Sequence, residues 1–103
     1  SMNTNNFESL AYFYAKSDNS DLAEYYIIKF AANVKSSDSY YSLTCIMSLL
    51  GKLDKAFEAL EQAAKMGYDY HWMQKDEDLA PLRELPKWTE IMKKYYPDQM
   101  KSK

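Results

Sequence analysis

A single histidine and a single cysteine are the chain's main candidates for catalysis or metal binding. His71 lies between Tyr70 and Trp72, and the acidic run 76–78 follows a few residues later. A general base needs a substrate proton within hydrogen-bond reach, and a zinc site needs three or four converging ligands. We interpret the acidic run instead as the solvated start of a helix, with Arg83 expected to pair with one of its carboxylates.

The cysteine, Cys45, is interpreted as a half-buried helix residue. A thiol becomes a nucleophile when a neighbouring base or positive charge favours the thiolate, and the residues from Tyr41 to Leu49 offer neither. The sequence also lacks a glycine-rich phosphate loop, a His-Glu-x-x-His pair and a nucleophile elbow. We therefore assign no catalytic residue, metal or cofactor. A small hydrolase or metal-dependent enzyme that uses His71 is kept as the less favoured alternative.

Length and composition set the class of protein. The 103 residues fit one domain, and two glycines and three prolines leave few helix breakers. With 47% hydrophobic and 27% charged residues, the composition is that of an ordinary globular protein. A net charge of −2 gives no basic field, and no apolar run approaches the roughly 18 residues of a membrane span. We therefore expect neither nucleic acid nor a membrane as a partner.

The start of the chain gives little information about its location. Ser1 before Met2 reads as a cloning scar, and no basic stretch followed by an apolar core is present there. An export signal or a preceding domain could have been removed with the scar. We take the cytoplasm as the default and leave the compartment open.

Hydrophobic spacing predicts two helices before residue 37. The first covers roughly residues 6–17 and ends in a polar turn. The second begins at Asp21, which resembles a capping box together with Glu24, because the carboxylate can accept a backbone N–H while the glutamate reaches back. The sequence 36–38 ends this helix and caps the next one. These elements predict a first hairpin at about 6–36.

Two further helices are predicted in a second hairpin at about 37–70. The third helix stops at Gly51 and the fourth ends at Gly67. The two hairpins repeat each other at a constant offset, which is the signature of stacked hairpins. Aromatic, large and small positions recur in order: Phe7 with Tyr40, Ser9 with Ser42, Leu10 with Leu43, Asp21 with Asp54, Ala23 with Ala56, Ile27 with Leu60 and Ala31 with Ala64.

The second hairpin resembles a tetratricopeptide repeat. Its aromatic, large, small and glycine positions follow the order of that family: Tyr40, Leu43, Thr44, Met47, Gly51, Ala56, Leu60 and Ala63. It departs from the family at Tyr68, where proline is usual. The first hairpin departs at Phe30, where a small residue is usual, and it has no glycine at its turn. The resemblance implies an all-α, right-handed helical-hairpin solenoid of two hairpins plus C-terminal capping helices.

Residues 71–97 resemble the tail that closes many bacterial tetratricopeptide arrays. The shared motifs are Gly67-Tyr68, Asp76-Glu77-Asp78-Leu79, Pro81-Leu82-Arg83 and Pro86-Lys87-Trp88. A solenoid must hide the apolar side of its last repeat. Seven residues are expected to cover it: Trp72, Leu79, Leu82, Trp88, Ile91, Met92 and Tyr95. We expect a helical capping segment at 71–97, in which Pro86 begins the final helix and Pro97 ends it.

The resemblance also implies where a partner binds. In tetratricopeptide arrays the first helix of each hairpin lines the concave face, and the groove positions map to Asn5, Glu8, Tyr12, Ala15 and Lys16, and to Asp38, Tyr41, Cys45, Ser48 and Leu49. Some family members clamp a C-terminal carboxylate with Lys and Asn at these positions, and this chain lacks that pattern. The candidate partner-binding residues are Glu8, Tyr12, Lys16, Tyr41, Cys45, Ser48 and Leu49.

Two tyrosines are the expected anchors of this groove. Tyr12 and Tyr41 offer flat side chains that contact apolar groups and still present a hydroxyl, the type of residue that dominates interface energy. The alternative, that both tyrosines pack beneath the C-terminal helix, stays open.

The first helix is more apolar than a hairpin requires. Six residues take up much of its circumference: Phe7, Leu10, Ala11, Tyr12, Phe13 and Tyr14. An N-terminal cap should instead have a polar outer face. We expect this helix to be covered, either by preceding repeats or by a second copy of the chain in a homodimer.

The sequence as a whole predicts a protein-interaction module, a scaffold or adaptor that holds a peptide or helix of a partner on its concave face. The alternative within binding is an accessory C-terminal domain of a larger bacterial enzyme or regulator. At the ends we expect a scar or disordered stretch at 1–5 and a flexible tail at 98–103.

Overall fold

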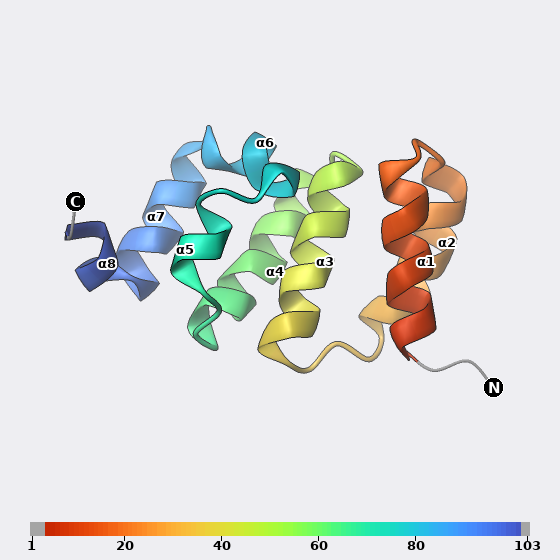
Figure 1. The fold of residues 1–103 in the computed structure, drawn as a ribbon, viewed down its shortest axis with the longest axis horizontal. Coiled ribbons are helices and arrows are strands. Elements are labelled where there is room, and N and C mark those ends of the chain that lie inside the picture. The colour runs from red at the N-terminus through yellow and green to blue at the C-terminus, as the bar shows by residue number, and fades with distance from the viewer. Residues whose placement is uncertain (1–3, 102–103) are drawn as a thin grey trace.

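A computed structural model describes residues 4–101, with side chains from residue 6 onward. This range is helical and contains no strand, so the predicted all-α class is confirmed for it. Helices α1 (Thr4–Lys16) and α2 (Ser20–Ala31) form one hairpin, and α3 (Ser37–Leu49) and α4 (Leu53–Lys65) form a second. Figure 1 shows the two pairs side by side along the long axis of the molecule.

The C-terminal third is a series of short helices that lies against the second hairpin. These are α5 (Tyr70–Met73), the 3₁₀ helix η1 (Glu77–Leu79), α6 (Ala80–Arg83), α7 (Pro86–Tyr95) and α8 (Pro97–Lys101). η1 packs against α3, and α7 packs against α4. The molecule is elongated, 45 × 24 × 19 Å, with α2 near one end and α8 at the other (Figure 1).

The two hairpin turns have the same backbone structure. Asp18 and Gly51 occupy equivalent places in the two hairpins, and both have positive φ, at 59° and 74°. Four backbone hydrogen bonds recur at the same offset: Ser17 to Phe13 and Leu50 to Ile46, Asp18 to Ala15 and Gly51 to Ser48, Asn19 to Tyr14 and Lys52 to Met47, Ala23 to Asn19 and Ala56 to Lys52. Aspartate tolerates this left-handed region better than most residues, so it replaces the glycine that the first turn lacks.

The start of α2 differs from the prediction. Asn19 is the N-cap, and its side chain accepts a hydrogen bond from the backbone N–H of Leu22. The predicted capping box of Asp21 and Glu24 is therefore wrong. The left-handed residue Asp18 turns the chain earlier than expected, which places Asn19 at the cap and Asp21 inside the first turn.

The start of α3 agrees with the capping sequence at 36–38. The Ser36 hydroxyl accepts a hydrogen bond from the Ser39 N–H at 3.0 Å, and the Ser39 hydroxyl accepts one from the Ser36 N–H at 2.9 Å. This reciprocal pair satisfies two N–H groups that a helix start leaves without partners.

One apolar core runs through both hairpins and the C-terminal segment. Of the seven residues predicted to cover the second hairpin, five are buried: Leu79, Leu82, Trp88, Ile91 and Met92. Tyr95 is partly buried. Trp72 is 44% exposed and Met73 is buried instead, which corrects the prediction. α5 is a single turn, and that turn directs Met73 rather than Trp72 into the core.

Both ends of the described range are helical. α1 begins at Thr4, so the first helix starts earlier than the expected residue 6, and residues 1–3 lie outside the described range. Residues 98–101 of the stretch 98–103, which was predicted to be a flexible tail, belong to α8; residues 102–103 are not described. Pro97 suits the first turn of α8, and Met100 packs against the core.

The helices are short. The longest have 13 residues, and within residues 4–101 none combines the length and apolar character needed to cross a bilayer.

Candidate functional site

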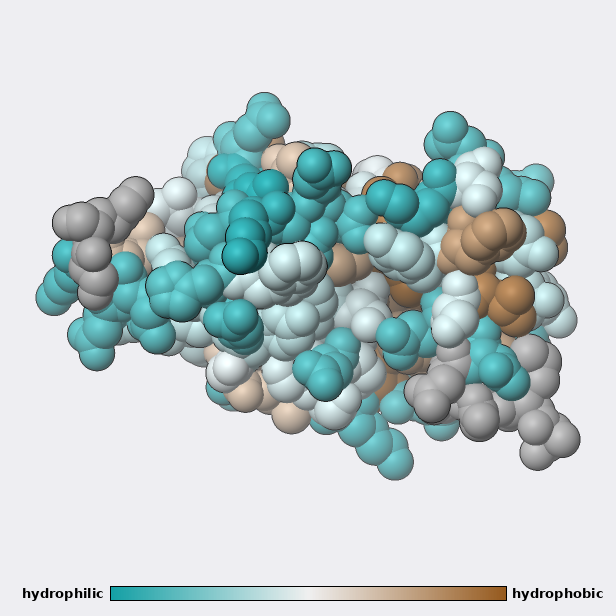
Figure 2. Space-filling view, viewed as in Figure 1, coloured by the Kyte–Doolittle hydropathy of each residue, from teal (hydrophilic) through white to brown (hydrophobic). Residues whose placement is uncertain are grey.

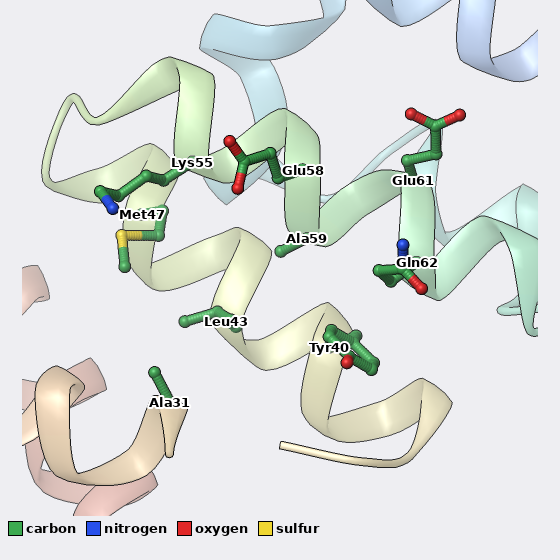
Figure 3. A pocket seen from close by; sticks show the side chains of 9 residues that line it. All are labelled: Ala31, Tyr40, Leu43, Met47, Lys55, Glu58, Ala59, Glu61 and Gln62. Atoms are coloured by element: carbon green, nitrogen blue, oxygen red, sulfur yellow. The ribbon is translucent and has the colours of Figure 1, made fainter. Parts of the chain in front are cut away.

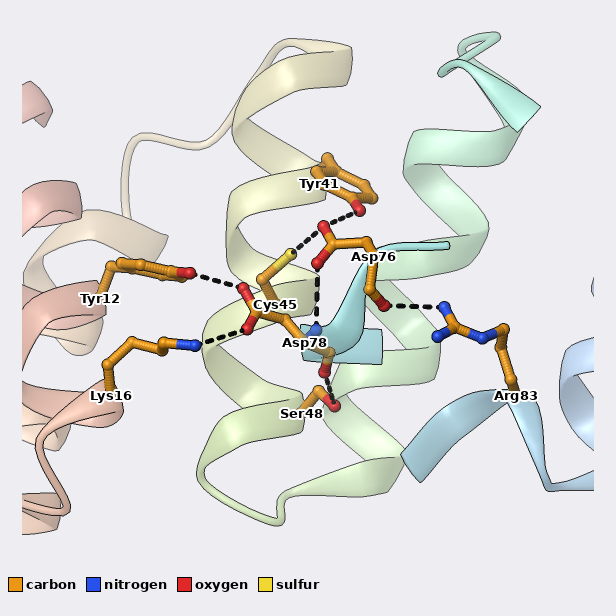
Figure 4. A network of polar contacts seen from close by, with 8 residues as sticks. All are labelled: Tyr12, Lys16, Tyr41, Cys45, Ser48, Asp76, Asp78 and Arg83. Carbon is orange, nitrogen blue, oxygen red and sulfur yellow. Dashed lines mark hydrogen bonds and ion pairs between the residues drawn. The ribbon is translucent and has the colours of Figure 1, made fainter. Parts of the chain in front are cut away.

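A network of polar contacts joins α1, α3 and the segment 74–79, as Figure 4 shows. This segment includes η1 and crosses the side of α3 that carries Tyr41, Cys45 and Ser48. The Ser48 hydroxyl donates to the main-chain carbonyl of Asp78 at 2.7 Å. The side of α3 that was predicted to face a partner therefore contacts the chain's own acidic segment.

Asp76 is the first acidic centre of the network. Its carboxylate accepts hydrogen bonds from the Tyr41 hydroxyl, from Cys45 Sγ at 3.8 Å and from the backbone N–H of Asp78 at 3.0 Å. Arg83 does not pair with a carboxylate as predicted. Its guanidinium donates instead to the main-chain carbonyls of Met73 and Asp76, both at 2.8 Å, and so fixes the first half of the segment.

Asp78 is the second acidic centre, and it reaches the first hairpin. Its carboxylate accepts a hydrogen bond from the Tyr12 hydroxyl at 2.7 Å and pairs with Lys16 Nζ at 3.2 Å. Asp78 is 9% exposed, whereas Lys16 is half-exposed. The segment 74–79, called the closing segment below, is thus bonded to both hairpins.

The protons of this network stay on the donors. Burial raises the pKa of the Cys45 thiol, and the charges of Asp76 and Asp78 raise it further. Burial also raises the pKa of Tyr41, as does its hydrogen bond to Asp76, and Tyr12 follows the same pattern with Asp78. A thiol with a raised pKa is a poor nucleophile at neutral pH. The chemistry that this arrangement supports is hydrogen bonding rather than covalent catalysis at Cys45.

A small pocket of about 270 Å³ opens between α1, α3 and the acidic segment. Its walls come from Glu8, Tyr12, Tyr41, Ser42, Cys45, Asp76 and Asp78. The Ser42 hydroxyl donates to the Glu8 carboxylate at 2.8 Å, which links α3 to α1 across this pocket.

Four of the seven predicted partner-binding residues line the pocket, and three do not. Glu8, Tyr12, Tyr41 and Cys45 line it, and Lys16 lies beside it through its pair with Asp78. The remaining two, Ser48 and Leu49, lie on α3 outside the pocket lining.

Three of the seven residues are less accessible than predicted. Tyr41, Cys45 and Ser48 are 4–6% exposed, because the segment 74–79 covers them. Tyr41 also stacks on Tyr68 with 3.9 Å between ring centroids. The alternative that both tyrosines pack beneath the C-terminal helix is therefore wrong: Tyr41 is buried against Asp76 and Tyr68, and Tyr12 remains 36% exposed.

Sequence reasoning missed the role of Asp76 and Asp78, which were interpreted as a solvated helix start. One signal was available in α3, which has no charged residue after Asp38. A helix with so little charge usually has more than one side covered by other parts of the protein. That pattern indicated that a further segment must cover α3, although it did not identify which one.

One group of potential metal ligands is present among the described residues. The ligand atoms of Cys45, Asp76 and Asp78 lie within 4.8 Å of one another. Each is already engaged, the first two with each other and Asp78 with Tyr12 and Lys16. His71 is not part of this group: it lies exposed on α5 with its ring against Tyr70.

A larger groove of about 610 Å³ lies where the C-terminal end of α2 meets α3 and α4 (Figure 3). Ala31, Tyr40, Leu43 and Met47 form part of its wall, and α4 contributes Ala59 and the polar residues Lys55, Glu58, Glu61 and Gln62. None of the seven predicted partner-binding residues lines this groove.

Exposed apolar side chains gather on the first hairpin. Figure 2 shows hydrophobic surface over α1 and α2, whereas the surface over the C-terminal helices is mostly hydrophilic in this view. Phe13 is 60% exposed on α1, and the outer residues of α2 are Leu22, Tyr25 and Ile28 at 39, 54 and 72%. The predicted apolar excess of the first helix is thus shared with α2.

Comparison with known proteins gives no match: no family model, no curated protein and no solved structure is similar to this chain.

Proposed function

We propose that this chain is a protein-interaction module of tetratricopeptide-repeat type, a short right-handed solenoid that binds a segment of a partner at the pocket between α1 and α3. The recurrence of turn geometry and hydrogen bonds at one constant offset supports the repeat. The observation that carries the binding site is the convergence of four groove residues, two from each hairpin, on one pocket.

The pocket is small, with a volume of about 270 Å³. Such a volume accommodates a side chain that a longer partner segment inserts. Tyr12, at 36% exposure, is the anchor on the rim, since it presents part of its ring and keeps its hydroxyl bonded to Asp78.

The charge of the pocket sets which partner groups are unsuitable. Glu8, Asp76 and Asp78 contribute three carboxylates, and Lys16 offsets one of them. A partner's terminal carboxylate would meet repulsion here. The bound segment is therefore an internal stretch of the partner with neutral or basic side chains.

Site-specific photo-crosslinking tests the proposal. The photoreactive residue p-benzoylphenylalanine replaces Glu8 in one variant and Glu58 in a matched variant, so that the first reports on the pocket and the second on the groove of Figure 3. After irradiation in cells of the source organism, the variant at Glu8 is expected to give an adduct with a defined protein. The variant at Glu58 is expected to give none with that protein.

Binding measured with the purified partner completes the test. Tyr12→Ala is expected to weaken the complex about tenfold or more, because it removes the exposed ring. Tyr12→Phe keeps the ring and should retain most of the affinity, which separates partner contact from the bond to Asp78. An adduct from Glu58 alone would contradict the proposal, as would unchanged affinity in a folded Tyr12→Ala variant.

A further inference from the structure

The outer face of α2 carries large apolar side chains that the hairpin fold does not require. Leu22, Tyr25 and Ile28 are exposed, and their regular spacing places them along one side of the helix. The equivalent positions of the second hairpin, on α4, are Lys55, Glu58 and Glu61. The same place in the second hairpin is thus charged, so the two hairpins do not share this exposed apolar row.

The charges around this row are arranged symmetrically. Leu22 and Ile28 lie three positions before and three after Tyr25, and Asp21 and Lys29 lie four before and four after it. Both charged residues are exposed, and Lys29 Nζ lies 4.9 Å from the centre of the Tyr25 ring, which places it on the same face. Reversing the direction of α2 about Tyr25 exchanges Leu22 with Ile28, which are both apolar. It also exchanges the acid Asp21 with the base Lys29.

We propose that this face binds a second copy of the chain, with the two α2 helices packed antiparallel about a two-fold axis at Tyr25. In that pairing Leu22 of one copy lies level with Ile28 of the other, and Asp21 lies level with Lys29. A two-fold contact must be complementary to itself, and this helix face meets that condition in both size and charge. The antiparallel helix dipoles also attract each other.

The position of α2 in the molecule allows this contact. α2 lies near the end of the elongated molecule that is opposite to α7 and α8 (Figure 1). The contact leaves the pocket between α1 and α3 in each copy to the proposed partner, and it stands independently of the proposed partner binding.

Sedimentation equilibrium of the full chain tests the dimer. Between about 1 and 500 µM the chain is expected to change from monomer to dimer. Ile28→Glu should weaken the dimer about 100-fold or more, because it buries an unpaired charge in the contact. The matched variant Glu58→Lys changes the position on α4 that corresponds to Tyr25, and it should leave the dimer unchanged. Circular dichroism verifies that each variant is folded.

A charge exchange tests the antiparallel register. Asp21→Lys places like charges level with each other and should weaken the dimer about tenfold, and adding Lys29→Asp in the same chain should restore it. A chain that stays monomeric at every concentration would overturn the proposal and leave the face to a different protein. A dimer that Ile28→Glu does not affect, or one that the charge exchange neither weakens nor restores, would overturn it as well.

Discussion

Asp76 holds the segment 74–79 on α3 by accepting three hydrogen bonds in the network of Figure 4. It accepts from the buried Tyr41 hydroxyl, from the Cys45 thiol and from the backbone N–H of Asp78. An ionised carboxylate accepts at both oxygens, so one side chain satisfies all three donors. The contact between this segment and α3 therefore depends on Asp76, although the residues next to it in the sequence are mostly exposed.

Removing that carboxylate is expected to cost stability. Asp76→Ala leaves the buried Tyr41 hydroxyl without its acceptor and should lower the free energy of unfolding by about 2–3 kcal/mol. Urea denaturation measures the change. The adjacent acid Glu77 is exposed, and Glu77→Ala should change the stability by less than about 0.5 kcal/mol. Equal effects of the two substitutions would show that Asp76 contributes no more than general surface charge.

At this scale the sequence identified part of the network. Positions taken from the family resemblance placed Tyr12, Lys16, Tyr41 and Cys45 near one another, and all four meet the acidic segment. The acids themselves were missed because a carboxylate at a helix start has the same local pattern whether solvent or a distant tyrosine contacts it. The contact from Tyr12 to Asp78 spans 66 residues, and no short-range spacing reports it.

At the scale of the elements, the sequence predicted the ends of α3 and α4 correctly and the start of α2 incorrectly. Gly51 and Gly67 end their helices as predicted, and both have positive φ. The first turn was predicted to lack the repeat's glycine, and its aspartate adopts the same backbone region. The capping box at Asp21 was wrong for this reason, since the sequence does not show which residue of the polar turn adopts the left-handed conformation.

This substitution of aspartate for glycine gives a prediction for the first hairpin. Asp18→Gly relieves the left-handed strain and should raise the stability by about 0.5 kcal/mol, which corresponds to a few degrees in Tm. The reverse change at the repeat-related position, Gly51→Asp, should lower it by a similar amount. Thermal unfolding followed by circular dichroism measures both. A loss of stability in Asp18→Gly would mean that the side chain of Asp18 contributes more than its backbone strain costs.

Because of its buried hydroxyl and thiol groups, the whole molecule should lose stability at alkaline pH. In an unfolded chain a cysteine titrates near pH 9 and a tyrosine near pH 10, whereas burial raises the pKa of both Cys45 and Tyr41 in the fold. Above pH 9 the unfolded state loses protons that the folded state keeps. The free energy of unfolding should therefore fall as pH rises, by up to about 1.4 kcal/mol per pH unit for each group.

Guanidinium denaturation between pH 7 and pH 11 checks this expectation. Cys45→Ala removes the thiol titration, so the decline should begin about one pH unit later than in the unchanged chain. Tyr68 and Tyr96, whose pKa values burial raises to about 12, add to the decline above pH 10. Stability that stays constant to pH 10.5 would contradict the protonated network.

The bonds from α1 to Asp78 also determine how the molecule comes apart. In an array of stacked hairpins each unit contacts its neighbours, and an end unit can open by itself. Here Lys16 and Tyr12 of the first hairpin bond to Asp78, in a segment that lies beyond the second hairpin. These contacts join residues that are 62 and 66 positions apart in the sequence. Opening the first hairpin breaks both contacts and uncovers α3. Local unfolding at the N-terminal end is therefore coupled to detachment of the closing segment from α3. We therefore expect the two hairpins to unfold together.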